Sequence, residues 1–125
     1  MAKLVIDAIL DAALDYIKSN ATKLCVCNSQ PTTYAQATAS YKLASVVINS
    51  ADFGSPADGD SSGRKIQMNA QSSVSIDSTG TAAHVALVKV AGSVLLYVTT
   101  TTATGLTGGG KVNVAAWDVE IADPT

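Results

Sequence analysis

The first twenty residues alternate between apolar and polar side chains with the period of a helix. Apolar residues recur every three or four positions, at Ile6, Ile9, Leu10, Ala13, Tyr16 and Ile17. Acidic residues share the opposite ridge, at Asp7, Asp11 and Asp15. The pattern predicts an amphipathic helix over residues 3–19 with its apolar face on a core and its acidic face in solvent. We expect Asn20, in a left-handed conformation, to end it.

After residue 20 the period changes from 3.6 to 2. Clusters of Gly, Pro, Asn and Ser separate seven strand candidates, which are residues 23–28, 41–49, 64–70, 72–77, 81–90, 93–101 and 111–122. One helix followed by seven short strands predicts a mainly β, β-sandwich or jelly-roll-like fold. At 125 residues the chain has the length of a single domain over 1–125, with helix 1–20 preceding a sandwich over 21–125.

The connections between these strands have signals of their own. Ala91-Gly92 indicates a tight hairpin, and residues 31–39 indicate a connection with a helical turn at Thr33–Ala37. We interpret the Thr/Gly-rich stretch 99–110 as a loop. In the last strand the apolar parity slips, which predicts a β-bulge near Ala115-Ala116.

Composition points to a protein partner. The chain is 47% hydrophobic but only 14% charged, so Ser, Thr, Ala and Gly stand where Lys and Glu normally keep a surface soluble. Part of the surface is therefore expected to face another protein. A net charge of −2 argues against a nucleic-acid partner. The three aspartates of the first segment argue against a signal peptide and a membrane-spanning helix, hence against a membrane partner.

The two cysteines, Cys25 and Cys27, lie two residues apart in a predicted strand. This spacing puts both side chains on one face and keeps their sulfurs apart, so a mutual disulfide would need a distorted turn. Buried or half-buried free thiols are the favoured interpretation. An intermolecular disulfide and a metal site remain alternatives.

Residues 105–111, GLTGGGK, match the skeleton of a phosphate-binding loop. That chemistry needs a hydroxyl next in the sequence and a helix to follow. Val112 takes the place of the hydroxyl residue, and an alternating strand pattern follows. We therefore interpret these residues as a glycine-rich loop and expect no nucleotide cofactor.

The stretch 56–66, PADGDSSGRKI, carries more chemically capable side chains than any other. It matches part of a calcium loop, but Asn69 stands where the bidentate Glu belongs, and two cations follow the acidic residues. We interpret it as a turn between strands 41–49 and 64–70, in which Arg64 pairs with Asp58 or Asp60. We expect no metal there, and predict that Asp58, Asp60 and Arg64 contact a partner protein.

Two further sets of side chains suggest catalysis. His84 lies in an alternating strand with Ala82 and Ala86 on its face, and no nucleophile-elbow motif accompanies it. Acidic residues gather near the C-terminus, at Asp118, Glu120 and Asp123. We interpret the histidine as structural and these acids as a strand edge that faces solvent or a partner. The sequence is not expected to be that of an enzyme.

Several phrases of the chain together resemble those of small virion structural proteins of tailed bacteriophages. They are AILDAALDYIKSNATKLCVC, QPTTYAQA, ADGDSSGRKI, TAAHVALV, LLYVTTTT and WDVEIADP. The resemblance spans nearly the whole chain and transfers no functional residues. It implies a capsid decoration or cement protein, located in the virion and made in the host bacterial cytoplasm. Its partners would be the major capsid protein and copies of itself, as a homo-oligomer.

Alternatives to this interpretation are a tail or fibre component and a carbohydrate-binding β-sandwich used in host attachment. We expect the contact regions to be the N-terminal helix and the loop over residues 54–63.

Overall fold

The computed structural model describes residues 4–123. Helix α1 spans Asp7–Asn20, and two short helical segments, η1 (Gln36–Ser40) and η2 (Ser50–Asp52), lie in connections. The strands are β1 (Lys23–Cys27), β2 (Lys42–Val47), β3 (Ala57–Asp58), β4 (Arg64–Met68), β5 (Gln71–Ser75), β6 (Gly80–Lys89), β7 (Val94–Leu106), β8 (Lys111–Val114) and β9 (Trp117–Ile121). Within these residues no helix is long and apolar enough to cross a membrane.

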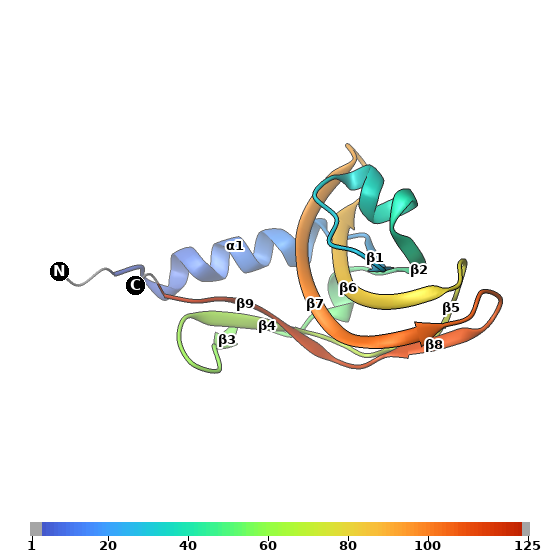
Figure 1. Cartoon of the computed structure of the whole chain (residues 1–125). Helices are drawn as coiled ribbons and strands as arrows, with labels where there is room; N and C mark the ends of the chain where they lie inside the picture. The colour runs from blue at the N-terminus through green and yellow to red at the C-terminus, as the bar shows by residue number, and fades with distance from the viewer. Residues whose placement is uncertain (1–3, 124–125) are drawn as a thin grey trace.

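All strand pairs are antiparallel, in sheets of order β2-β1-β6-β7, β3-β4-β9 and β5-β8. A bridge between Ala44 and Ile76 connects β2 to the β5–β8 pair. The fold is thus mainly β and β-sandwich-like with one N-terminal helix, which confirms the predicted fold class. In Figure 1 the four-stranded sheet curls at one end of the molecule. The other end, which we call the stem, consists of α1, β3, β4 and β9.

The core contains aliphatic side chains from both ends of the molecule. Its largest fully buried members include Leu14 of α1, Leu24 of β1, Ile66 and Met68 of β4, and Leu87 of β6. A smaller cluster lies between the four-stranded sheet and the segment around η1, and comprises Cys25, Cys27, Ala37, Ala86 and Val88. Alternate residues of β1 contribute to the two clusters, Leu24 and Val26 to the larger one and Cys25 and Cys27 to the smaller one, because successive side chains of a strand point to opposite faces.

The helix departs from the prediction at its C-terminus. Asn20 is helical rather than left-handed, and Ala21 follows in an extended conformation with its N–H donating to the Ile17 carbonyl. The Asn20 side-chain amide donates to the Tyr16 carbonyl at 2.8 Å. Since only one residue separates Ala21 from β1, an extended exit replaces the left-handed cap that sequence suggested.

The buried face of α1 also differs from the prediction. Leu10 and Leu14 are buried and Ile17 packs against the core, whereas Ile6, Ile9, Ala13 and Tyr16 are exposed. The sequence could not separate these two sets because both recur at helical spacing. The choice between them comes from tertiary contacts of α1 with β4 and β9.

Strand β7 is longer than predicted. The prediction of a loop over residues 99–110 is wrong for residues 99–106, which belong to β7. Thr99 pairs with Val85, Thr100 with His84 and Thr104 with Ala82, so the threonines extend the hairpin with β6. Threonine is β-branched and suits an extended strand, a preference that outweighed the polar composition. Only residues 107–110 form a turn before β8.

Two predicted connections are confirmed, one predicted feature is wrong, and two short elements were missed. The β6–β7 hairpin turns through Gly92 at φ 85° and Ser93 at φ 56°, and residues 34–40 are helical. The expected bulge at Ala115-Ala116 is instead a break between β8 and β9, which pair with β5 and β4 in different sheets. Sequence reasoning missed the short elements β3 and η2.

Candidate functional site

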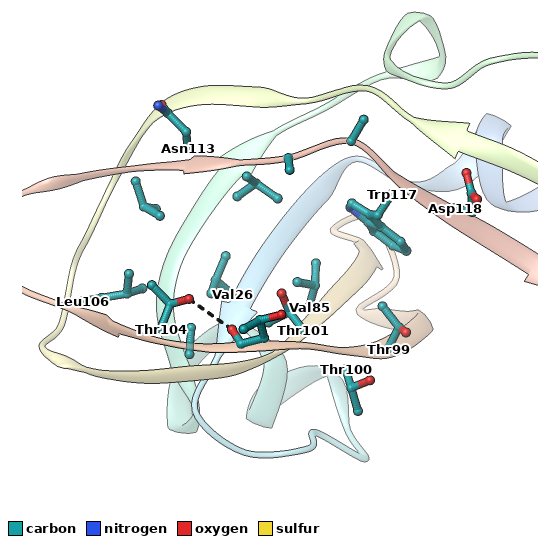
Figure 2. Close-up of a pocket in the computed structure, with 16 residues that line it drawn as sticks. Val26, Val85, Thr99, Thr100, Thr101, Thr104, Leu106, Asn113, Trp117 and Asp118 are labelled. Atoms are coloured by element: carbon teal, nitrogen blue, oxygen red, sulfur yellow. Dashed lines mark hydrogen bonds between the residues drawn. The ribbon is translucent and has the colours of Figure 1, made fainter.

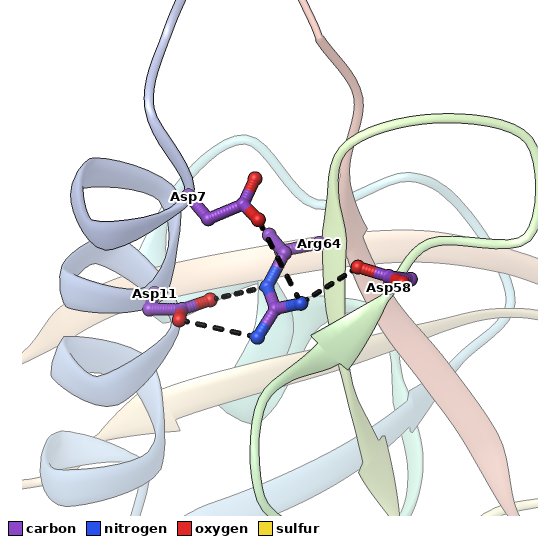
Figure 3. A network of polar contacts seen from close by, with 4 residues as sticks. All are labelled: Asp7, Asp11, Asp58 and Arg64. Atoms are coloured by element: carbon purple, nitrogen blue, oxygen red, sulfur yellow. Dashed lines mark hydrogen bonds and ion pairs between the residues drawn. The ribbon is translucent and has the colours of Figure 1, made fainter.

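Arg64 holds α1 to the rest of the stem. Its Nε donates to Asp11 Oδ1 at 2.8 Å and its Nη2 to Asp11 Oδ2 at 3.3 Å, which makes the contact bidentate (Figure 3). Its Nη1 donates to Asp58 Oδ1 at 2.7 Å and lies 3.9 Å from Asp7 Oδ2. Hydrogen bonds from Arg64 to Asp11 and Asp58 raise its pKa above the ordinary value. One guanidinium therefore connects α1, β3 and β4.

These contacts correct the expectation that the acidic ridge of α1 is solvated. The Asp11 side chain is only 27% exposed and receives two donors from Arg64, whereas Asp15 is exposed. Asp58, at 89% exposure, accepts a single hydrogen bond from Arg64 Nη1. The interaction with Asp11 should be the stronger, because bidentate charge-assisted pairs shielded from water exceed exposed ones.

Lys65 forms a second set of ion pairs on the other side of β4. Its Nζ lies 2.7 Å from Asp60 Oδ1 and 3.2 Å from Asp118 Oδ2. Glu120 Oε1 accepts the backbone N–H of Asp60 at 2.8 Å. The hydrogen bond to Lys65 lowers the pKa of Asp60, and contacts with Asp60 and Asp118 raise the pKa of Lys65. The half-buried side chains of Asp118 and Glu120 lie on the edge strand β9, as predicted, and contact groups within the stem.

The same residues bring three carboxylates together beside Lys65. Carboxylate oxygens of Asp60, Asp118 and Glu120 lie within 4.8 Å of one another, and the Lys65 ammonium pairs with two of them. Asp58 turns instead to Arg64, so the two aspartates of the calcium-like pattern bind different cations. The loop is a turn as predicted, but it joins β3 to β4 rather than strand 41–49 to strand 64–70, because β2 and β4 lie in different sheets. The predicted pairing of Arg64 with Asp58 is confirmed. Partner contact by this loop stays a prediction.

The outward side of α1 is apolar and bare. Ile6, Ile9 and Tyr16 are 57%, 59% and 58% exposed, and Ala8, Ala12 and Ala13 beside them are exposed too. At about 100° per residue, the charged residues of α1 fill an arc of roughly 80° and the bare uncharged residues one of roughly 160°. In Figure 1 α1 extends from the curled sheet along β4 and β9. We call Ile6, Ile9, Ala13 and Tyr16 the bare face of α1.

A groove of about 420 Å³ opens between β7 and the chain from β8 to β9 (Figure 2). Threonines of β7 line one wall and Trp117 part of the other, over core residues that include Val26 and Val85. Trp117 stacks on Tyr97 with ring centroids 6.1 Å apart, and its buried Nε1 has no hydrogen-bond partner among the described residues. Sequence reasoning missed this groove because it took the threonine run for a loop.

The cysteines are free and fully buried beneath η1, as the favoured interpretation predicted. The Cys27 thiol donates to the Ala37 carbonyl at 3.6 Å. Burial raises the pKa of Cys27 to about 12, with a further contribution from Cys25, and burial also raises the pKa of Cys25. Both thiols are therefore held in their neutral, unreactive form.

The remaining sequence candidates occupy separate places. His84 is half-buried in β6, aligned with Cys27 and Thr100 on the neighbouring strands, and its Nδ1 has no partner among residues 4–123. Ala82 does not share its face as predicted, because the β6–β7 register shifts between them and Ala82 joins the main core. The loop that resembles a phosphate site leads into β8, where Lys111 Nζ donates to Ser75 Oγ at 2.7 Å.

Comparisons with protein-family models, curated proteins and solved structures find no match to this chain.

Proposed function

We propose that this protein is a non-enzymatic structural component of a tailed-bacteriophage virion, a capsid decoration or cement protein that binds the assembled head and stabilises it. The observation that carries the proposal is the bare face of α1. An exposed apolar patch on a well-packed protein marks a surface that another protein covers. Here it lies on a chain with an unusually small share of charged residues.

Stabilisation would come from buried area repeated over many copies. Each apolar Å² removed from water contributes about 25 cal/mol, so roughly 300 Å² per copy supplies about 7.5 kcal/mol before the cost of association. The stem offers two surfaces for this purpose, the bare face of α1 and the β3–β4 loop with Asp58 and Asp60. Ion pairs within the stem hold both in one fixed arrangement.

The loop contact is tested with Asp58→Ala and Asp60→Ala combined. We expect this double variant to bind purified phage heads more weakly while EDTA leaves binding by the unaltered protein unchanged. Ser75→Ala serves as the control, because Ser75 is exposed and lies in β5, outside the stem. If the double variant binds like the unaltered protein, the loop is not the contact.

Copy number in purified particles separates a head protein from a tail or fibre protein. We expect hundreds of copies per particle, as for a protein that covers the capsid lattice. A handful or a few dozen copies would instead identify a tail or fibre component. Quantitative mass spectrometry against the major capsid protein gives this number directly.

The groove favours a second candidate function, carbohydrate binding during host attachment. Threonine hydroxyls and an aromatic ring together line a groove within the size range of small-ligand sites. In this case a glycan array probed with the protein would give binding that Trp117→Ala abolishes. No binding to any glycan would rule this candidate out.

A further inference from the structure

We propose that the groove beside β7 binds an extended segment of another polypeptide, which pairs with β7 and adds a fifth strand to the four-stranded sheet. The segment carries apolar side chains at every second position and fills the groove with them. The inference goes beyond the proposed function, because the groove is a different surface from the bare face of α1 and from the β3–β4 loop.

The first observation is that β7 lies at the edge of its sheet without cover. It pairs with β6 alone, and no other segment among residues 4–123 forms a backbone hydrogen bond with it. Alternate residues of an edge strand point their N–H and C=O groups away from the sheet. Residues 100–105 are all exposed, so neither face of β7 is covered there. An extended backbone is the ligand that satisfies a row of such groups.

The composition of β7 is the second observation. Proteins protect the edges of their sheets with charged side chains, proline, short strands or cover, because a free edge pairs with other strands. Strand β7 is 13 residues long, beyond the usual length of a strand, and contains no charged residue and no proline. It therefore has the features that strand addition requires and lacks those that prevent it.

The other edge strands of the described chain differ from β7 in this respect. Strands β2 and β5 meet through the bridge between Ala44 and Ile76, and β3 has only two residues. Strand β8 carries Lys111, and β9 carries Asp118 and Glu120. Because these edges are covered, short or charged, we assign strand addition to β7.

The groove determines which side chains the added segment needs. Trp117 lies across the groove from the threonines of β7 (Figure 2). Leu106 is buried in the groove, and Val112, Val114 and Trp117 are half-buried. A strand laid along β7 directs every second side chain toward these residues and the others toward solvent. Apolar residues at alternate positions would therefore extend the core of the protein.

Selection from a library of short random peptides, displayed on ribosomes and captured by the full chain, tests the inference. We expect the enriched peptides to carry apolar residues at alternate positions, with no proline among them. No enrichment would overturn the proposal. Enriched peptides with the apolar spacing of a helix would also overturn it.

Hydrogen–deuterium exchange tests whether the best selected peptide binds as a strand. Amides of residues 99–106 should exchange more slowly when the peptide is bound, and amides of α1 should not change. Two copies of the peptide are also compared, N-methylated at its odd or at its even positions. One copy should bind at least about tenfold more weakly than the other, because it loses several backbone hydrogen bonds to β7. Equal binding by both copies would contradict strand pairing.

A charge on the edge of β7 tests the location. Thr102→Lys should weaken binding of the selected peptide at least about tenfold, because an edge lysine opposes strand addition. Thr107→Lys is the matched control, since Thr107 is an exposed threonine in the turn before β8 and does not line the groove. Circular dichroism checks that both variants fold. Equal binding by the two variants would place the peptide elsewhere.

Three further outcomes separate this inference from other uses of the same surfaces. If glycans bind the groove and no peptide does, the inference fails in favour of host attachment. If the free protein is a stable dimer that Thr102→Lys dissociates, β7 of a second copy occupies the edge and the inference also fails. If peptides bind as described but the protein does not bind phage heads, the inference stands and the proposed function fails.

Discussion

At the scale of single residues, the Arg64 guanidinium contacts two carboxylates whose surroundings differ. Asp11→Asn removes a shielded bidentate partner and should lower the free energy of unfolding by about 1–2 kcal/mol. Asp58→Asn removes an exposed partner and should cost less than about 0.5 kcal/mol. Urea unfolding of both variants gives the comparison. Equal losses would mean that burial of the pair does not govern its strength.

Burial of the thiols leads to a prediction about how the stability of the fold depends on pH. Burial raises the pKa of Cys27 from 9.0 to about 12, so folding favours the neutral thiol. This contribution to stability is complete below pH 9 and is lost as pH rises from about 9 toward 12. Cys27→Ala should therefore show a smaller loss of melting temperature between pH 8 and pH 10.5 than the unaltered protein. An unchanged slope would contradict the assignment.

At the scale of elements, α1 shows which side of a helix a protein core selects. Leu14 is fully buried, and Leu14→Ala should lower the free energy of unfolding by about 3 kcal/mol. Ile9→Ala, the matched change on the bare face, should cost less than about 0.5 kcal/mol. Denaturant unfolding at low micromolar concentration tests both. The reverse order would place Ile9 in the core, as the sequence pattern suggested.

Two glycines of the β3–β4 hairpin, Gly59 and Gly63, leave no room for a side chain, and Gly63 is the one in a left-handed conformation. Gly63 has φ 71°, and a Cβ there would collide with the Ile121 carbonyl oxygen of β9. Gly63→Ala should therefore lower stability by about 2 kcal/mol or more. Gly105→Ala is the control, because a Cβ at that position in β7 meets no atom within 4 Å and should be tolerated. Similar melting temperatures for the two variants would contradict this account of the hairpin.

Local patterns predicted the elements better than they predicted their contacts. The alternation of side chains predicts the strand around Leu87, and Gly92 predicts the hairpin that follows it. Both signals lie close together in the sequence. The pairing of Arg64 with Asp11 joins residues 53 positions apart, and no local signal indicates it. The groove was missed for a related reason, since Thr99 and its neighbours become a wall only by pairing with β6.

At the scale of the whole molecule, the protein has a curled sheet at one end and a stem at the other, and the outer side of the stem exposes the apolar bare face of α1. Ion pairs fix the inner side of α1 to β4, and the outer side has no charge and no cover among residues 4–123. Under the proposed function, this uncovered side of the stem is a surface that contacts an assembled phage head.

Calorimetry of purified, expanded heads tests this role most directly. Heads lacking the protein should melt at a higher temperature once it is added, by a few degrees, with a fixed number of copies per head at saturation. The increase should disappear when Ile9→Asp replaces the unaltered protein and persist with Val90→Asp, the same change at an exposed apolar position in the β6–β7 turn. Heads that bind none of the protein and melt at an unchanged temperature would contradict the account.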